Sequence, residues 1–177
     1  MILIYLNKVE KDRWLPQLFA LFYENMSKYT PVGLSYEAER EEWLRNVSPA
    51  LDKEPRQVLL ALDGQKLAGF VMFYTRRELL MVEEFQIQKD YQGGLLFLRM
   101  CRKLLRDLPN EIQWVEAFAH RGNEHSRRLM ERLGMNSLEE PGDFFLHLRG
   151  DARDLLRHLG YVNKKQILEE RNGPLQS

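Results

Sequence analysis

The sequence predicts an α+β fold in which an antiparallel sheet is combined with amphipathic helices. The first observation behind this is a run of three strand-like segments, 57–62, 66–75 and 79–88. They are joined by the hairpin dipeptide Asp63-Gly64 and by a turn at 75–78, so an antiparallel meander is expected. The second observation is a change between helix-like and strand-like patterns on both sides of this run. The expected order is strand, two helices, three strands, helix, strand, helix and strand.

The N-terminal third supplies the first strand and the first two helices. Residues 2–6 are short, apolar and β-branched, which is typical of a strand. From Asp12 to about residue 27 apolar residues recur at intervals of three and four, which predicts an amphipathic helix. Ser35 followed by glutamates predicts the start of a second helix, over 35–47. The linker at 27–36 is a candidate substrate loop.

The C-terminal half continues with alternating elements. Helical spacing over 97–108 stops at Pro109, and 112–120 has the pattern of a strand. Asn123 is a candidate N-cap for the next helix, and Gly134 suits a left-handed C-cap. A last strand is predicted at 143–149 and a last helix from 151. The polar end, 171–177, is expected to be frayed.

Composition favours one globular domain and gives no sign of nucleic-acid or membrane binding. The chain has 177 residues, of which 44% are hydrophobic and 29% charged, and its 26 basic residues balance 26 acidic ones. We expect a single domain at 1–150, with 151–177 as its C-terminal helical extension. The single cysteine, Cys101, suits a reducing compartment, and the N-terminus shows no signal peptide, so the cytoplasm is expected.

Two motifs resemble the GNAT superfamily of acyl-CoA N-acyltransferases. They are VEEFQIQKDYQGG at 82–94, similar to the family's central strand and following loop, and NEHSRRLMERLGM at 123–135, similar to its second signature. With the flanking strands, the resemblance covers roughly residues 2–149. It implies a three-layer fold, with a mixed, mostly antiparallel central sheet and helices on both faces. It also implies acetyl-CoA as co-substrate and no metal.

A loop that leads from a strand into a helix N-terminus suits the pyrophosphate of the coenzyme, because several backbone N–H groups there have no helical partner. The expected loop residues are Gln92, Gly93, Gly94, Leu95, Leu96 and Phe97. Leu95 and Phe97 stand where the family has small residues, and the two glycines also fit an ordinary tight turn. The resemblance further implies that the backbone of Phe85, Gln86 and Ile87 pairs with the pantetheine arm. It places Asn123 near the coenzyme, although an N-cap role explains that residue equally well.

Acyl transfer to an amine needs a base, and three glutamates are candidates. Glu83 and Glu84 lie on the central strand and are expected on opposite faces, with Glu84 favoured. Glu116 lies on the next strand. The family's usual acid, a tyrosine, is replaced by Met130, which has no proton to donate. The histidines lack metal-ligand spacing.

The expected function is an acyl-CoA-dependent N-acyltransferase that transfers acetyl by direct attack of an amine. The acceptor would be a small molecule or a peptide, and a homodimer is one possible assembly. A GNAT-like module without turnover is the alternative, favoured by Leu95, Phe97 and Met130. Transfer of another acyl group is a third interpretation.

Overall fold

The computed structural model describes residues 1–29, 33–53, 55–93, 95–138 and 144–160. Within these ranges one seven-stranded sheet has the order β1-β2-β3-β4-β5-β7-β6. Its strands are β1 (Ile2–Tyr5), β2 (Gln57–Asp63), β3 (Lys66–Arg76), β4 (Leu79–Ile87), β5 (Trp114–His120), β6 (Asn136–Leu138) and β7 (Phe145–Asp151). Every neighbouring pair is antiparallel except β4 and β5, which are parallel. The predicted mixed, mostly antiparallel sheet is confirmed.

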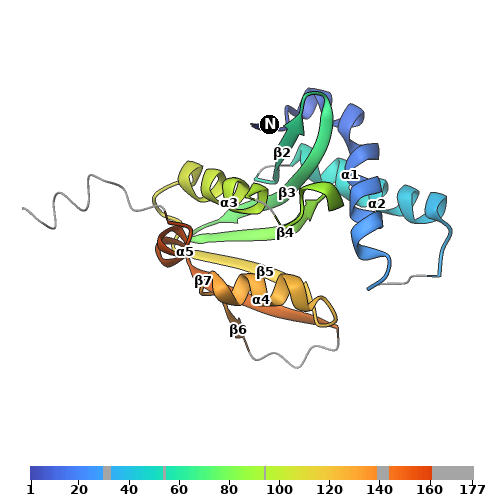
Figure 1. Cartoon of the computed structure of the whole chain (residues 1–177). Helices are drawn as coiled ribbons and strands as arrows, with labels where there is room; N and C mark the ends of the chain where they lie inside the picture. Colours follow the sequence, from blue (N-terminus) through green and yellow to red (C-terminus); the bar gives the residue numbers. More distant parts are fainter. Residues whose placement is uncertain (30–32, 54, 94, 139–143, 161–177) are drawn as a thin grey trace, which may run out of the picture.

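Helices cover both faces of the sheet (Figure 1). They are α1 (Lys11–Met26), α2 (Tyr36–Asp52), α3 (Leu96–Asp107), α4 (Glu124–Arg132) and α5 (Ala152–His158), with short 3-10 turns η1 (Lys8–Glu10) and η2 (Lys89–Tyr91). One buried cluster joins α1 and α2 to the face of β2 and β3 that carries Phe70 and Met72. The other joins α3 and α5 to the opposite face, which carries Val71 and Leu148. The fold is therefore a three-layer helix–sheet–helix arrangement.

Local sequence explains where the first two long helices begin and end. Trp14, Leu15 and Leu18 share one face of α1 and are buried. The Ser35 side chain accepts a hydrogen bond from the Ala38 N–H at 3.3 Å, so it caps α2 as expected. α2 continues to Asp52, past the predicted end at 47. We attribute the extension to Leu51, which is 3% exposed and holds the last turn against the core despite Pro49.

The predicted strands agree with the observed ones to within two residues at each described end. The short strand β6 was not predicted, and it adds to the sheet through β7. Residues 139–143, where the last strand was expected to begin, and residues 161–177 lie outside the described part. None of the helices in the described ranges is long and apolar enough to cross a bilayer.

A β-bulge interrupts β4 next to the candidate catalytic residues. Phe73 of β3 is opposite Val82, but the next residue of β3, Met72, is opposite Glu84, so Glu83 is the additional residue. Glu84 therefore lies on the face of Met72, which α1 and α2 cover. Strict alternation, on which Glu83 and Glu84 were assigned to opposite faces, does not hold here.

Candidate active site

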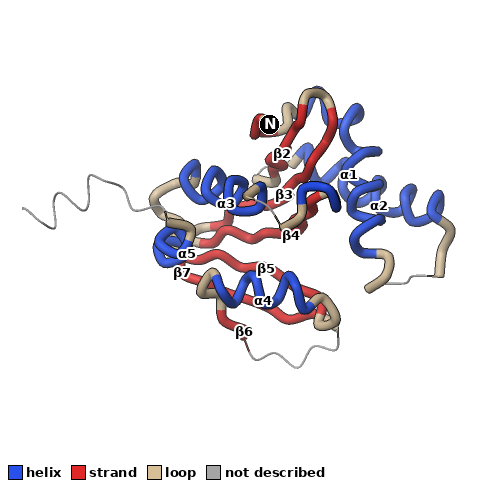
Figure 2. Tube along the Cα trace, in the orientation of Figure 1, coloured by secondary structure: helices blue, strands red, loops and turns tan. Residues whose placement is uncertain are grey.

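The two parallel strands at the centre of the sheet separate halfway along their length. Their pairing runs from Leu79 with Trp114 to Val82 with Ala117. Beyond that point β4 continues to Ile87 and β5 to His120, and Figure 2 shows the two strands diverging. The inner edge of β4 at 83–87 consequently has no β5 strand beside it. Its N–H and C=O groups are positioned to pair with an extended ligand.

An apolar cavity of about 50 Å³ lies against the paired part of β4 and β5 and reaches Phe85, on the side of α3, α4 and α5. Val82 and Phe85 line it from β4, Ala117 from β5, Phe97 from α3 and Met130 from α4. Met130 is thus part of an apolar wall. The cavity is an apolar hollow between these helices and the sheet.

The loop before α3 has the geometry expected of a turn into a helix N-terminus. Gly93 has φ of +74°, a conformation that favours glycine. The Gln92 side chain donates to the Ile87 carbonyl at 2.8 Å and so ties the loop to the end of β4. Gly94 lies outside the described residues.

The side chains at the start of α3 take three different positions. Leu95 is 69% exposed, and Leu96 is buried at 5%. The Phe97 ring lies 4.8 Å from that of Phe85, measured between centroids. The N-cap residue Leu95 makes no side-chain hydrogen bond to the first N–H groups of α3, and such groups at a helix N-terminus suit an anion.

Glu84 has the environment of a general base. Burial raises the pKa of this carboxyl to about 7, the Gln86 hydrogen bond opposes the rise, and the negative charge of Glu83 adds to it. The Gln86 Nε2 group donates to Glu84 Oε2 at 2.9 Å, while Asn25 of α1 donates to Gln86 Oε1 at 3.0 Å. Asn25 thereby fixes the Gln86 amide in the orientation that donates to Glu84. A carboxyl with a pKa near the working pH is suited to taking and releasing a proton.

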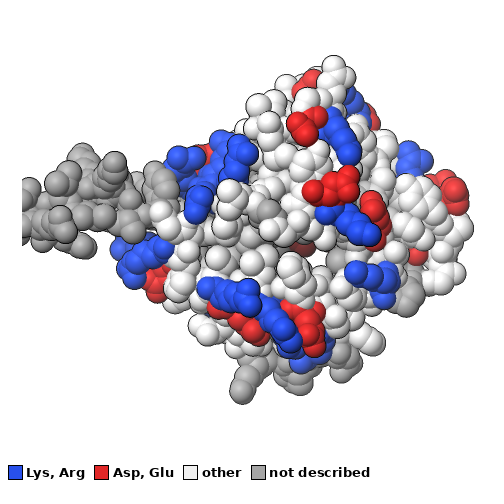
Figure 3. All heavy atoms as spheres, viewed as in Figure 1, with Lys and Arg blue, Asp and Glu red and all other residues white. Residues whose placement is uncertain are grey.

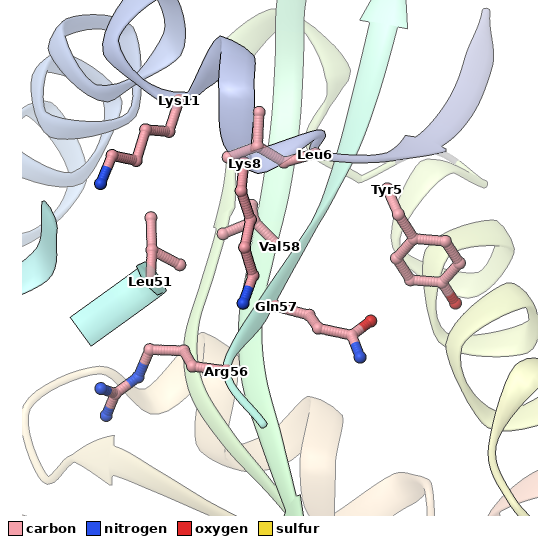
Figure 4. A pocket seen from close by; sticks show the side chains of 8 residues that line it. All are labelled: Tyr5, Leu6, Lys8, Lys11, Leu51, Arg56, Gln57 and Val58. Atoms are coloured by element: carbon pink, nitrogen blue, oxygen red, sulfur yellow. The ribbon is translucent and has the colours of Figure 1, made fainter. Parts of the chain in front are cut away.

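Glu83 is held in an ion pair with Arg56, which precedes β2. Arg56 also lines a hollow of about 150 Å³ between η1, α1 and the start of β2. In Figure 4 Lys8 and Lys11 enter this hollow from one end and Arg56 lies across from them. Lys11 is itself paired with Asp52. The charge of Glu83 is therefore balanced by Arg56.

Glu116 is also engaged in ion pairs, on the neighbouring strand β5. Burial alone would raise the pKa of Glu116, but hydrogen bonds from Arg149 and His147 outweigh it and keep the pKa below its usual value. The Arg149 Nε group donates to Glu116 Oε1 at 2.6 Å, and His147 Nε2 lies 2.9 Å from Glu116 Oε2. The carboxylate stays ionised and holds β5 to β7.

Asn123 acts as the N-cap of α4, since its Oδ1 accepts from the Ser126 N–H at 3.2 Å.

Three polar residues around the glutamates were not predicted from the sequence, namely Asn25, Arg56 and Arg149. They come from α1, the start of β2 and β7, and no local motif marks them. Alternation along 143–149 was the one available signal, because it places Arg149 on the same face as His147.

The surface between α3 and α4 carries little charge, whereas Lys and Arg side chains lie along both helices (Figure 3). Lys103 of α3 pairs with Asp107, and Arg128 of α4 pairs with Glu124.

No group of three His, Cys, Asp or Glu side chains in the described ranges could hold a metal ion.

These features fit an acyl thioester of coenzyme A. The open edge of β4 offers backbone pairing, and the N-terminus of α3 suits a pyrophosphate. Glu84 lies on β4 beyond its pairing with β5, on the face of the sheet that α1 and α2 cover. The arrangement can therefore combine a thioester on one face with a proton acceptor on the other.

Comparison with known proteins agrees with this geometry. Residues 4–136 match the family model described as acetyltransferase (GNAT) domain. An acetyltransferase from Thermus thermophilus superposes with a TM-score of 0.65 at 16% identity, over 85% of this chain and 97% of that one. Tetrahymena GCN5 gives 0.66 at 12%, over 86% and 96%. The PaiA N-acetyltransferase from Thermoplasma acidophilum, solved in complex with coenzyme A, gives 0.61 at 14%, over 85% and 99%.

No curated protein sequence matches the chain. The solved structures support the fold, and the family model covers most of the sequence. The chain belongs to the GNAT family of acetyltransferases.

Proposed function

We propose that this protein transfers an acetyl group from acetyl-CoA to an amine, with Glu84 as the general base. The observation that carries the proposal is the position of Glu84 at the opening between β4 and β5, with a pKa of about 7. The other two glutamates are held by cations, Glu83 by Arg56 and Glu116 by Arg149. Glu84 is thus the candidate whose carboxyl is tuned for proton transfer near neutral pH.

Acetyl-CoA supplies the thioester whose acyl group is transferred. The backbone of Phe85, Gln86 and Ile87 is proposed to pair with its pantetheine arm, and residues 92–97 are proposed to bind its pyrophosphate. Asn123, at the N-terminus of α4, is proposed to lie beside the coenzyme. Support comes from the open edge of β4 and from the start of α3.

Transfer is proposed to be direct, without an acyl-cysteine. Cys101 lines the apolar cavity, but burial raises the pKa of its thiol to about 12. At neutral pH the thiol is almost wholly protonated, and the thiolate is the nucleophilic form. The amine itself is therefore the nucleophile that we propose, and Glu84 takes its proton.

Thermal unfolding with acetyl-CoA and with free coenzyme A tests the binding step. A ligand at about 100 times its Kd adds roughly 2.7 kcal/mol to the free energy of unfolding. That corresponds to a rise of roughly 5–10 °C in Tm for a domain of this size. An acetyl-transfer assay with a panel of amines then tests turnover. An unchanged Tm at millimolar ligand would contradict the proposal.

The alternative is a ligand-binding or protein-interaction module that has the same fold but no turnover. Two observations favour it: Phe97 packs on Phe85 at the edge of the cavity, and Met130 replaces a proton donor. This alternative predicts coenzyme A binding without acetyl transfer to any amine. The two assays together separate the two functions.

Replacing Arg56 tests how charge sets the pKa of Glu84. Arg56→Gln removes the cation that balances Glu83, so the uncompensated carboxylate should raise the pKa of Glu84 above 7. The base then ionises at higher pH, and the rising limb of the kcat/KM profile should move to higher pH. A profile measured with saturating acetyl-CoA checks this. Arg128→Gln, which removes an exposed arginine paired on α4, should leave the profile unchanged.

A further inference from the structure

Exposed aromatic side chains gather on one face of β5 and β7. Phe118 is 50% exposed and Phe145 is 42% exposed, although both are large apolar residues on central strands. Register pairs Phe118 with His147 and His120 with Phe145, so these four side chains share one face. The opposite face of β5 carries Val115, Ala117 and Ala119, which are buried. We call the set Tyr29, Phe118, His120, Phe145 and His147 the aromatic face.

The rings of the aromatic face contact one another and are held in place. Phe118 stacks on His147 with centroids 4.5 Å apart, and His120 meets Phe145 edge-on at 5.4 Å. Tyr29, which follows α1, lies 5.4 Å from His120. Nδ1 of His120 accepts the Gly122 N–H at 3.0 Å, so a neutral ring carries its proton on Nε2. These contacts hold the rings in fixed positions, and preorganised groups bind a ligand at low entropic cost.

The aromatic face adjoins the proposed general base. Phe118 follows directly after Ala117, the last residue of β5 paired with β4, and Glu84 lies two residues after the partner of Ala117, Val82. Both side chains therefore flank the opening between the strands. Glu84 is on the face of α1 and α2, and the contact between Tyr29 and His120 places the aromatic face on that side too.

Two of the three glutamates near this site are engaged by arginines. Ion pairs with Arg56 and Arg149 already neutralise Glu83 and Glu116. Among the described residues Glu84 is bonded to Gln86 and has no ion-pair partner. An arriving ammonium group therefore meets a carboxyl that has no ion-pair partner among the described residues, and a ring attached to it meets the side chains of the aromatic face. Aromatic pairs and cation–π contacts are favourable in such a setting.

We propose that the acceptor is a primary amine joined by a short alkyl chain to an aromatic ring. The ring lies on the aromatic face, and the amine lies at Glu84. This inference rests on the proposed function. The amine nitrogen forms a bond to the acyl carbon as the carbon–sulfur bond breaks, and the electron pair of that bond leaves with the sulfur. Of the two protons that an ammonium acceptor loses, one reaches the sulfur and one leaves to solvent through Glu84.

Kinetics with 2-phenylethylamine and n-butylamine test the proposal, since the two amines differ in the ring. The wild-type protein should prefer 2-phenylethylamine by about tenfold in kcat/KM, the factor that aromatic contacts of 1–1.5 kcal/mol give. Phe118→Ala should raise KM for 2-phenylethylamine about fivefold and leave n-butylamine unchanged. Val9→Ala, which removes a side chain that is 89% exposed on η1, is the matched control and should change neither. Equal use of the two amines would overturn the inference and leave the proposed function intact.

Calorimetric titration of 2-phenylethylamine into the protein provides a readout that does not depend on turnover. Weaker binding to Phe118→Ala than to the wild type supports the aromatic face as the binding site for the ring. If no acetyl transfer is found at the same time, the proposed function is contradicted and the binding site is not. Heat of binding that is absent, or equal in both proteins, overturns the inference. Sedimentation tests whether a second copy of the chain occupies the aromatic face instead. A wild-type dimer that dissociates in Phe118→Ala would identify the face as a dimer interface and overturn the inference.

Discussion

Glu84→Gln should lower kcat/KM for acetyl transfer by about 10²–10⁴-fold, the range in which general bases contribute to rate. Gln keeps the size of the side chain but has no ionisable carboxyl to accept the amine proton. Coenzyme A binding should stay unchanged, because the proposed contacts with the coenzyme come from the backbone of β4 and from residues 92–97. Initial rates over a range of amine concentrations, together with a calorimetric titration of coenzyme A, check both parts.

The same variant has an expected effect on stability that depends on pH. The pKa of Glu84 is raised by burial from 4.5 to about 7, so the folded state disfavours the ionised carboxyl. The wild type consequently loses stability as pH rises from about 4.5 to about 7, whereas Glu84→Gln does not. The Tm of the variant relative to that of the wild type should therefore increase across this window.

Glu131→Gln is the matched control for Glu84→Gln, because it changes a glutamate that is half exposed on α4 and paired with Arg127. It should keep full activity and show no such trend in Tm. Wild-type activity in Glu84→Gln would show that another group takes the proton, and the role proposed for this carboxyl would have to be abandoned.

Met100→Ala should lower the free energy of unfolding by about 2–5 kcal/mol, the usual cost of truncating a buried Met to Ala. Met100 is fully buried on the inner side of α3 and belongs to the cluster that fixes this helix to the sheet. Its loss leaves a cavity under the helix whose N-terminus is proposed to bind pyrophosphate. Urea unfolding followed by circular dichroism measures the change.

Leu95→Ala provides the comparison at the start of the same helix. Leu95 is 69% exposed, so its truncation should alter stability by no more than about 0.5 kcal/mol. If both variants unfolded at the same urea concentration, α3 would not be held to the sheet through Met100. Coenzyme A affinity should fall in Met100→Ala and remain near wild type in Leu95→Ala, because the latter removes no backbone donor.

The sequence was sufficient to predict most of the fold because its signals were local. Asp63-Gly64 set the hairpin, Ser35 and Asn123 capped their helices, and apolar spacing located α1 and α3. The strand β6 was not predicted because three residues are too few to show an alternating pattern. Its position in the sheet depends on its pairing with β7. The end of α2 was missed because burial of Leu51 outweighs the effect of a proline on helix propensity.

The candidate site was harder to predict, because its electrostatics arise from contacts across the sequence. Three glutamates were equivalent acids in the sequence, and their separation into one poised base and two ion-paired carboxylates depends on Arg56 and Arg149. The bulge at Glu83 has no sequence marker, so alternation gave the wrong relation between the two neighbouring glutamates. The coenzyme contacts and the catalytic role remain predictions that the experiments above address.

The separation of β4 from β5 also leaves backbone groups with which a strand of another chain could pair. Residues 83–87 form a sheet edge inside the molecule rather than at its border. A free edge is a template for adding a strand from another chain, and proteins usually protect such edges by shortening, twisting or covering them. Here the bulge adds local twist at one end of the open segment. A ligand arm paired along the rest would complete the protection, so ligand occupancy and resistance to aggregation would depend on the same backbone groups.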